Sequence, residues 1–465
     1  MLSSARMMGG MDSGEVEEVR SEVDALRRDL AEERFRHVAG LAARPSLAPI
    51  FETHPVAAHR DTVRALREAG ERDLSDRVAG LAAERASAEG EERWRAADAS
   101  ATGLGPDGPV PLSEAELALL HDRDRERRGM LGRAVVEGAH ASAAPREAAA
   151  EARAAARSSL GLTPAWEEVV QADGLLAASD AAYADLLGWF ARRDGLEPHP
   201  RGDLDRTELL HLLAFRDHDG LFRSAPLSRA VLDGFDGLGA DVRRVRLDGG
   251  ARAAKWPGAH PFEGRVSFRR QGGLADWIDL MDAAGRASVL GASRPSTRDP
   301  ALAATVGALG VGLLLEPRFL AAAAGAERKG SRDVARRLAL RLLFQLRVRA
   351  AAFRVATEVE RGTGGRAWHE AHREALTRAT LASWPDGLAH RDDDAGELRA
   401  TLAGAAWAAA IRHDLRERFD EDYWRNPRTG EALSGRLAAG SPGPQEERPP
   451  LAGAAEALVS VLEGI

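Results

Sequence analysis

The chain has 465 residues, a formal net charge of −8 and no cysteine. The acidic balance argues against a general nucleic-acid role, and the lack of cysteine excludes disulfides, cysteine-ligated metal sites and a cysteine nucleophile. We see no signal-peptide core and no run of the roughly 20 apolar residues that a membrane span needs. We therefore expect a cytoplasmic protein that binds neither membranes nor nucleic acid.

The predicted elements are almost all helices. Alanine, leucine, arginine and glutamate dominate and aromatic residues make up only 5%, which favours helix over strand. Apolar residues recur at three-and-four spacing over 12–42, 55–70, 72–98, 113–140, 145–160 and 164–193, and again over 451–463. Alternation between glycines predicts two strands in the middle of the chain, "DVRRVRLD" (241–248) and "GRVSFRRQ" (264–271). The second strand leads through a Gly-Gly turn into a helix over 272–289.

Four stretches then occur in a familiar order: "DLDRTELLHLLAFRDHDGLF", "GRVSFRRQGGLADWIDLMDAAGRA", "LLLEPRFL" and "LRERFDEDYWRNPRTGEAL". They resemble the thimet oligopeptidase and oligoendopeptidase-like zinc metallopeptidases of the gluzincin group. The similarity runs from about residue 15 to 435. It implies a mostly α, two-lobed helical fold with a central channel and a small β-sheet beside the zinc helix. We accordingly expect an N-terminal helical lobe (12–200), a degenerate metallopeptidase-like domain (201–440) and a linker with a C-terminal helix (441–465).

The zinc motif of that family is missing. In HExxH, two histidines on one helix face hold zinc, the glutamate activates water, and a glutamate on a later helix completes the site. Carried onto this chain, the histidine positions are Asp282 and Arg286, the general base is Ala283 and the third ligand falls near Ala304. One carboxylate cannot supply the three protein ligands of a catalytic zinc. The sequence therefore predicts no metal and no cofactor.

The groups that stabilise the oxyanion in this family are also absent. The resemblance implies tyrosines or histidines on a late helix, where this chain has Arg399 and Ala403. Its two tyrosines are Tyr183, in the N-terminal helical part, and Tyr423, in the "YWRNP" stretch that we interpret as structural. Both the zinc ligands and the oxyanion-stabilising groups are missing, at separate places in the sequence. The sequence therefore predicts a protein that does not hydrolyse peptides.

Two interpretations of the former zinc face stay open. Asp282 and Arg286 are four residues apart and can form an ordinary helix ion pair, or Arg286 can bind an anion in the old channel. The candidate ligand-binding set on the second interpretation is Asp282, Arg286, Arg269, Arg270, Gln271 and Arg399. Residues 266–271 would form the edge strand along which an extended peptide binds.

Other motifs are weaker. His369, Glu370 and His372 cluster on a predicted helix, and Asp217, His218 and Asp219 share a loop, but neither set has zinc-ligand spacing. "GALGVG" lacks the G-x-G-x-x-G spacing and a preceding strand. The Arg-rich stretch at 328–354 is best explained as a solvated helix face.

The favoured function is that of a pseudopeptidase which binds a peptide, a small ligand or a partner protein through the inherited channel. Association with a second copy of the chain is also open. One alternative is a metal-free enzyme that uses the same channel with Asp282, Arg286 and Arg269 or Arg270. Another alternative is a residual or atypical zinc peptidase, which the missing ligands disfavour.

Overall fold

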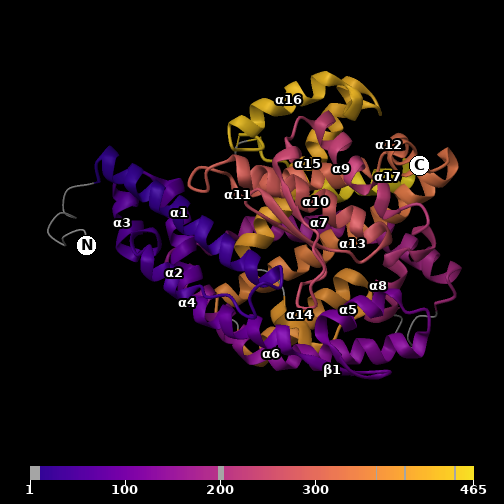
Figure 1. Ribbon diagram of the computed structural model, residues 1–465, viewed down its shortest axis with the longest axis horizontal. Helices are drawn as coiled ribbons and strands as arrows, with labels where there is room; N and C mark the ends of the chain where they lie inside the picture. Colours follow the sequence, from indigo (N-terminus) through magenta and orange to yellow (C-terminus); the bar gives the residue numbers. More distant parts are fainter. Residues whose placement is uncertain (1–10, 197–203, 363, 392–393, 445–446, 465) are drawn as a thin grey trace.

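The computed structural model describes residues 11–196, 204–362, 364–391, 394–444 and 447–464. The N-terminal helices lie together at one end of the molecule (Figure 1). They are α1 (Ser13–Val38), α2 (Ala48–Thr53), α3 (Arg60–Glu68) and α4 (Arg72–Ser100). Asp12 starts α1 with a capping box, in which its carboxylate accepts the backbone N–H of Glu15 and the Glu15 carboxylate accepts that of Asp12. Apolar residues at helical spacing from α1 to α4 form a core of their own.

A long helix, α6 (Arg125–Ser159), connects this lobe to the rest of the molecule and packs along α4. The sequence predicted two helices here, with a break before Pro145, and this prediction is wrong. Pro145 removes one backbone donor, but close packing holds the helix together: a methyl placed on Gly90 of α4 would lie 2.7 Å from the Ala149 Cβ of α6. A hairpin of β1 (Thr102–Gly105) and β2 (Gly108–Pro111), followed by α5 (Leu112–His121), precedes α6.

The larger lobe has one continuous hydrophobic core. Its helices are α7 (Trp166–Arg193), α8 (Arg206–Ala214), α9 (Ser224–Leu238), α10 (Gly273–Ala292), α11 (Pro300–Leu313), α12 (Pro317–Ala324), α13 (Arg328–Glu360), α14 (Gly365–Thr380), α15 (Ala395–Phe419), α16 (Pro427–Ala438) and α17 (Leu451–Gly464). Both α7 and α17 contribute to this core. The domain boundary expected at 200–201 lies outside the described residues, and the expected division at 441 stays a prediction.

A three-stranded sheet lies beside α10, as the resemblance predicts. Its order is β4 (Arg246–Asp248), β6 (Arg265–Arg269) and β5 (Gly258–Phe262), with β4 parallel and β5 antiparallel to β6. The expected edge strand at 266–271 is therefore wrong, because β6 is the central strand and both of its sides are paired. The edge on the side of the N-terminal lobe is β5, where Phe262 packs edge-on against Phe35 of α1. A two-residue parallel pair, β3 (Leu204–Asp205) and β7 (Ala382–Ser383), joins distant segments.

Within the described ranges no single helix is long and apolar enough to cross a membrane. The pair α11 and α12 passes the length and composition test only when taken together, and the two helices are bent by 78°. In α11, all but two residues are buried in the core of the larger lobe.

Candidate functional site

The face of α10 on which the resemblance places the zinc motif carries an ion pair. The Arg286 Nε donates to Asp282 Oδ2 at 2.7 Å, as the i,i+4 spacing predicts. The two side chains are 17% and 32% exposed, so water reaches the pair. Ala283, at the general-base position, is 1% exposed and belongs to the core. The one carboxylate among the four positions of the predicted zinc site is thus already paired with a cation.

The helices around the third ligand position are in close contact. Ala304 of α11 is 2% exposed, and a methyl placed on Gly404 of α15 would lie 2.5 Å from its Cβ. α10 and α11 approach equally closely, since a methyl on Gly285 would lie 2.8 Å from the Val306 carbonyl oxygen. Small residues let these helix backbones meet, and Ala304 serves this packing.

These residues do not fit a zinc ion. Of the four positions only Asp282 has a ligand atom, and Arg286 places a fixed positive charge beside it. Among the residues that the structure describes, no group of three or more His, Asp or Glu side chains is arranged to hold a metal. His369 instead lies 3.6 Å from Glu147, and His218 lies 3.4 Å from Asp333.

The two tyrosines are buried. Tyr183 is 0% exposed and donates to the Thr380 carbonyl oxygen at 3.1 Å. Tyr423 is also 0% exposed, and burial raises the pKa of both phenols. On α15, Ala403 is buried, and the exposed Arg399 lies 3.5 Å from Glu168 of α7. Neither position presents the oxyanion donor of a peptidase.

The strand end before α10 holds a polar cluster. The Gln271 side chain donates to Asp279 at 2.7 Å, and its backbone N–H donates to Asp276 at 2.7 Å. Burial, with a further contribution from the neighbouring carboxylates, raises the pKa of Asp279 to about 6 although Arg341 acts in the opposite direction. This network orients the start of α10.

The structure does not bring the six predicted ligand-binding residues together. Asp282 and Arg286 pair on α10, Gln271 binds Asp279, and Arg399 reaches α7. Arg269 pairs with Glu114 of α5 and donates to the Lys255 carbonyl oxygen, while Arg270 is exposed. Since most of these groups already have partners on different elements, they do not form one ligand site.

A charged cavity of about 500 Å³ lies between the two lobes. We call it the interlobe chamber; its walls come from α1, α4 and α6 on one side and from β5, the end of α10, α13, α14 and α15 on the other. Its ionisable and aromatic lining residues include Arg27, Arg34, Glu84, Glu91, Trp94, Arg95, Arg146, Arg153, Arg157, Glu263, Arg298, Glu360, Trp368, His372 and Asp394.

Glu91 of α4 is the centre of this lining. It is 3% exposed and lies 2.8 Å from Arg95, 3.1 Å from Arg34 and 3.1 Å from Arg153. Burial acts to raise the pKa of Glu91, but the three guanidinium groups hold it well below its usual range. Arg153 also reaches Asp394 of α15 at 3.0 Å, so the network connects the lobes.

Two charges in the chamber form no direct ion pair with another described residue, although each acts electrostatically on the other. Arg298 donates to backbone carbonyls and a hydroxyl, at 3.3 to 3.4 Å, and burial lowers its pKa to about 10 although Glu263 acts in the opposite direction. Burial raises the pKa of Glu263, in the turn after β5, although Arg298 acts in the opposite direction. Trp94 also lines the chamber, with the Arg146 guanidinium 3.9 Å from its ring centre. The chamber thus offers an available cation, an available anion and an aromatic surface.

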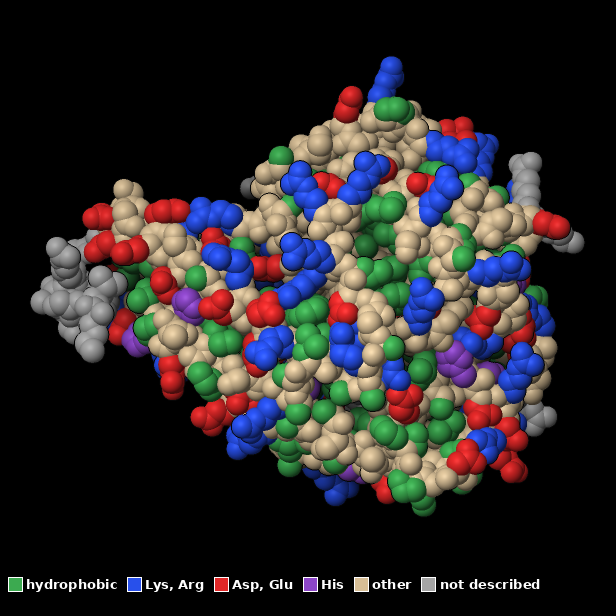
Figure 2. All heavy atoms as spheres, viewed as in Figure 1, with side chains coloured by type: hydrophobic (Ala, Val, Ile, Leu, Met, Phe, Trp, Pro, Cys, Tyr) green, Lys and Arg blue, Asp and Glu red, His purple; other side chains and the backbone are tan. Residues whose placement is uncertain are grey.

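Sequence reasoning missed this chamber. Its residues come from helices whose Arg and Glu content is typical of solvated faces, and they converge only when the two lobes meet. Of the residues that the sequence singled out, His372 alone lines it. The outer surface gives no hint either, because acidic and basic side chains are interspersed over the face in Figure 2.

No family model matches the sequence, and no curated protein matches it. The structure is similar to a protein assigned as oligoendopeptidase F from Bacillus anthracis str. Ames, with a TM-score of 0.50 and 14% identity over 98% of this chain and 86% of that one. A second protein assigned as oligoendopeptidase F gives a TM-score of 0.56 and 14% identity, over 98% of this chain and 97% of that one. PZ peptidase A, solved with an inhibitor, gives a TM-score of 0.52 and 12% identity, over 98% of this chain and 88% of that one. The predicted resemblance is confirmed at the level of the fold: this chain is built on the helical, two-lobed fold of the oligoendopeptidases.

Proposed function

We propose that this protein is a pseudopeptidase that binds a short peptide in the interlobe chamber. The observation that carries the proposal is the chamber itself: a cavity between the lobes of a peptidase fold, with an available cation and an available anion on its wall. Its volume of about 500 Å³ is within the range of small-ligand sites.

The residues of α10 support binding without hydrolysis. A zinc peptidase needs about three protein ligands and a base that activates the bound water. Here the base position is a buried alanine, and the ligand positions carry a mutually neutralised Asp282–Arg286 pair and the packed Ala304. On this proposal, the interlobe chamber binds the peptide and the α10 positions do not hydrolyse it.

The charges of the chamber favour a ligand with both signs. A short peptide with free ends carries one ammonium and one carboxylate group, which match Glu263 and Arg298. Charge-assisted hydrogen bonds of this kind are among the strong ones in proteins. Strand addition contributes little, because β6 lies between β4 and β5 and the part of β5 in the chamber contains Pro261, which has no N–H to donate.

The test uses a mixed tetrapeptide library with free ends, and the same library with acetylated and amidated ends. Peptides that stay with the protein through gel filtration are identified by mass spectrometry. We expect retention of free-ended peptides only, and a loss of about tenfold in affinity for Arg298→Gln. Arg229→Gln, which removes an exposed pair with Asp233 on α9, is the matched control and should bind normally.

The same incubation separates the alternatives. Absence of retention, or equal retention of the blocked library, would contradict peptide binding by end charges. Cleavage of the library that requires added zinc would favour an atypical zinc peptidase. Metal-independent conversion of the library would favour a metal-free enzyme.

A further inference from the structure

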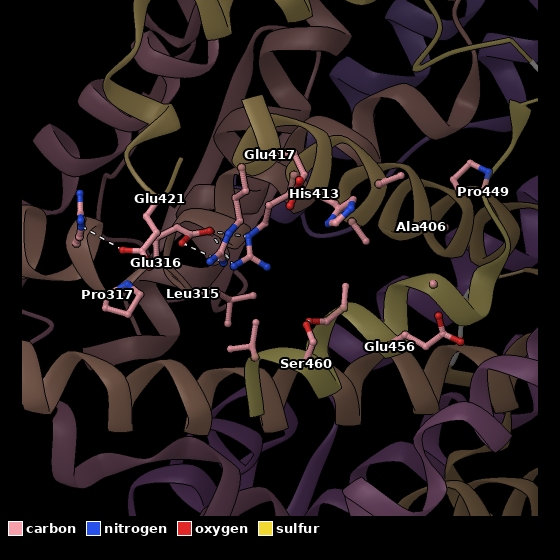
Figure 3. A pocket seen from close by; sticks show the side chains of 18 of the residues that line it. Leu315, Glu316, Pro317, Ala406, His413, Glu417, Glu421, Pro449, Glu456 and Ser460 are labelled. Carbon is pink, nitrogen blue, oxygen red and sulfur yellow. Dashed lines mark hydrogen bonds and ion pairs between the residues drawn. The ribbon is translucent and has the colours of Figure 1, made fainter. Parts of the chain in front are cut away.

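A second cavity lies at the far end of α15. It has a volume of about 1020 Å³ and is bounded by α12, α15 and α17 (Figure 3). The chamber is lined by the first turn of α15, at Ala395 and Glu397, whereas this cavity is lined by α15 between Ala406 and Glu417. The two cavities share no lining residue. We call the second one the α15–α17 cavity.

A buried carboxylate organises one end of the α15–α17 cavity. Glu316, which precedes α12, is 1% exposed, and its Oε1 lies 2.8 Å from both Nε and Nη2 of Arg412. Its Oε2 lies 3.5 Å from Arg416, one helical turn further along α15. Figure 3 shows Glu316 at one end of the cavity and Glu456 of α17 at the other. Glu316 therefore fixes two guanidinium groups on one cavity wall.

At this end one buried carboxylate contacts two arginines, because Glu316 lies against both Arg412 and Arg416. His413 and the exposed Glu417, also on α15, line the cavity as well. The Arg416 side chain is 39% exposed and contacts Glu316 through one nitrogen at 3.5 Å, so it keeps donors that Glu316 does not occupy. A nearby acid, Glu421, shares Arg318 with Asp422, at 3.1 and 2.5 Å. Glu316 orients both guanidinium groups, but its single negative charge cannot neutralise both. Two arginines held in this way are suited to bind an oxyanion.

Part of the remaining wall is apolar. Leu315, Ala406, Ala410, Ala457 and Val461 line the space between the arginines and the α17 side. A cavity with an apolar wall and a few convergent polar groups at one end is the usual form of a small-molecule site. A nucleic acid or another polyanion does not suit it, because Glu417 and Glu456 at the rim repel extended negative charge.

We propose that the α15–α17 cavity binds a small organic anion, with its carboxylate or phosphate head on Arg412 and Arg416 and its apolar body along Leu315 and Val461. This site does not depend on the proposed peptide-binding function, since it lies outside the chamber.

The test is calorimetric titration of the full chain with octanoate, hexyl phosphate, inorganic phosphate and the neutral octanol. We expect an organic anion to bind, octanol to bind at least about tenfold more weakly, and inorganic phosphate to lack the contribution of the apolar wall. Comparison of octanoate with hexyl phosphate decides between a carboxylate and a phosphate head. Arg416→Gln should weaken the binding of the anion about tenfold, and Arg416→Lys should restore part of it.

A neighbouring variant supplies the control. Arg418 is exposed, pairs with Asp414 at 2.9 Å and does not line the cavity, so Arg418→Gln should bind the anion normally. The proposal is overturned if neither organic anion binds the folded protein, if octanol binds equally well, or if Arg416→Gln binds like the unchanged protein. It is also overturned if Arg298→Gln, in the chamber, weakens anion binding as much as Arg416→Gln does.

Discussion

Asp282 and Arg286 form an ion pair on α10 at two of the positions where the sequence predicts the lost zinc ligands. Their ion pair is open to water, and pairs of this kind contribute about 0.3–0.5 kcal/mol in helices. We predict that a double-mutant cycle of Asp282→Ala and Arg286→Ala, followed by urea denaturation, gives a coupling free energy below about 1 kcal/mol. A coupling of several kcal/mol would instead indicate that the fold depends on this pair.

Asp279, one turn before Asp282, makes stability depend on pH. Its pKa in the folded chain is raised from 3.8 to about 6, so the folded state holds this proton more tightly than the unfolded state does. Stability from this group is therefore full at low pH and falls as pH rises through about 4 to 6. Relative to the unchanged protein, Asp279→Asn should gain stability as pH rises from about 4 to 7. Thermal denaturation at several pH values measures this difference, and parallel stability curves for the two proteins would refute the assignment.

At the scale of residues, the sequence predicts the Asp282–Arg286 pair because i,i+4 spacing is a local property. It does not predict the partners of Arg269 and Arg399, which pair with Glu114 and Glu168 on other helices. Nor does it predict that Arg298 and Glu263 are left available, since that depends on which carboxylates and guanidinium groups the folded chain brings near them.

At the scale of elements, α10, α11 and α15 are held in contact by small residues. Gly404 lies so close to Ala304 that an added methyl would overlap its Cβ. We expect Gly404→Ala to lower the free energy of unfolding by about 1–3 kcal/mol, the usual cost of overpacking.

Gly174, in the middle of α7, is the matched control because nothing lies within 4 Å of a methyl placed there. Gly174→Ala should raise the free energy of unfolding by about 0.4–1 kcal/mol, since alanine restricts the unfolded chain. Chemical denaturation of both variants checks the contrast. Equal effects would mean that α11 and α15 are further apart than described.

Most helices could be predicted because their apolar periodicity is a local signal. The continuous α6 could not, because the packing along α4 that overrides Pro145 comes from a segment distant in sequence. β5 was missed since "GAHPF" is short and contains proline, and without it β6 was interpreted as an edge. Strand order is set by pairing between segments and leaves no periodic signal in one sequence.

At the scale of the whole molecule, Arg153 connects the lobes. It lies 3.1 Å from Glu91 of α4 and 3.0 Å from Asp394 of α15, and its Nε donates to Ser87 at 2.9 Å. Removal of one partner from a buried ionic network typically costs about 3–5 kcal/mol. Arg153→Gln should cause a loss of this size, whereas Arg64→Gln, which removes an exposed pair with Asp61, should cost under about 1 kcal/mol.

The pH dependence of this connection has the opposite sign to that of Asp279. Because the pKa values of Glu91 and Asp394 are lowered in the folded chain, their stabilisation is present above the ordinary carboxyl range and is lost on acidification. Arg153→Gln should therefore destabilise the protein less in acid than at neutral pH. Denaturation of the variant at both pH values tests this, and an equal loss at both would place Arg153 outside the ionic network.

The central claim is that a peptidase fold here serves binding without zinc chemistry. Elemental analysis of the untagged chain, dialysed against micromolar zinc and then against buffer, tests it most directly. We predict far less than one zinc ion per folded chain, and no change in that value for Asp282→Ala. One zinc ion per chain that Asp282→Ala removes would contradict the claim and would make α10 a metal site of an unfamiliar kind.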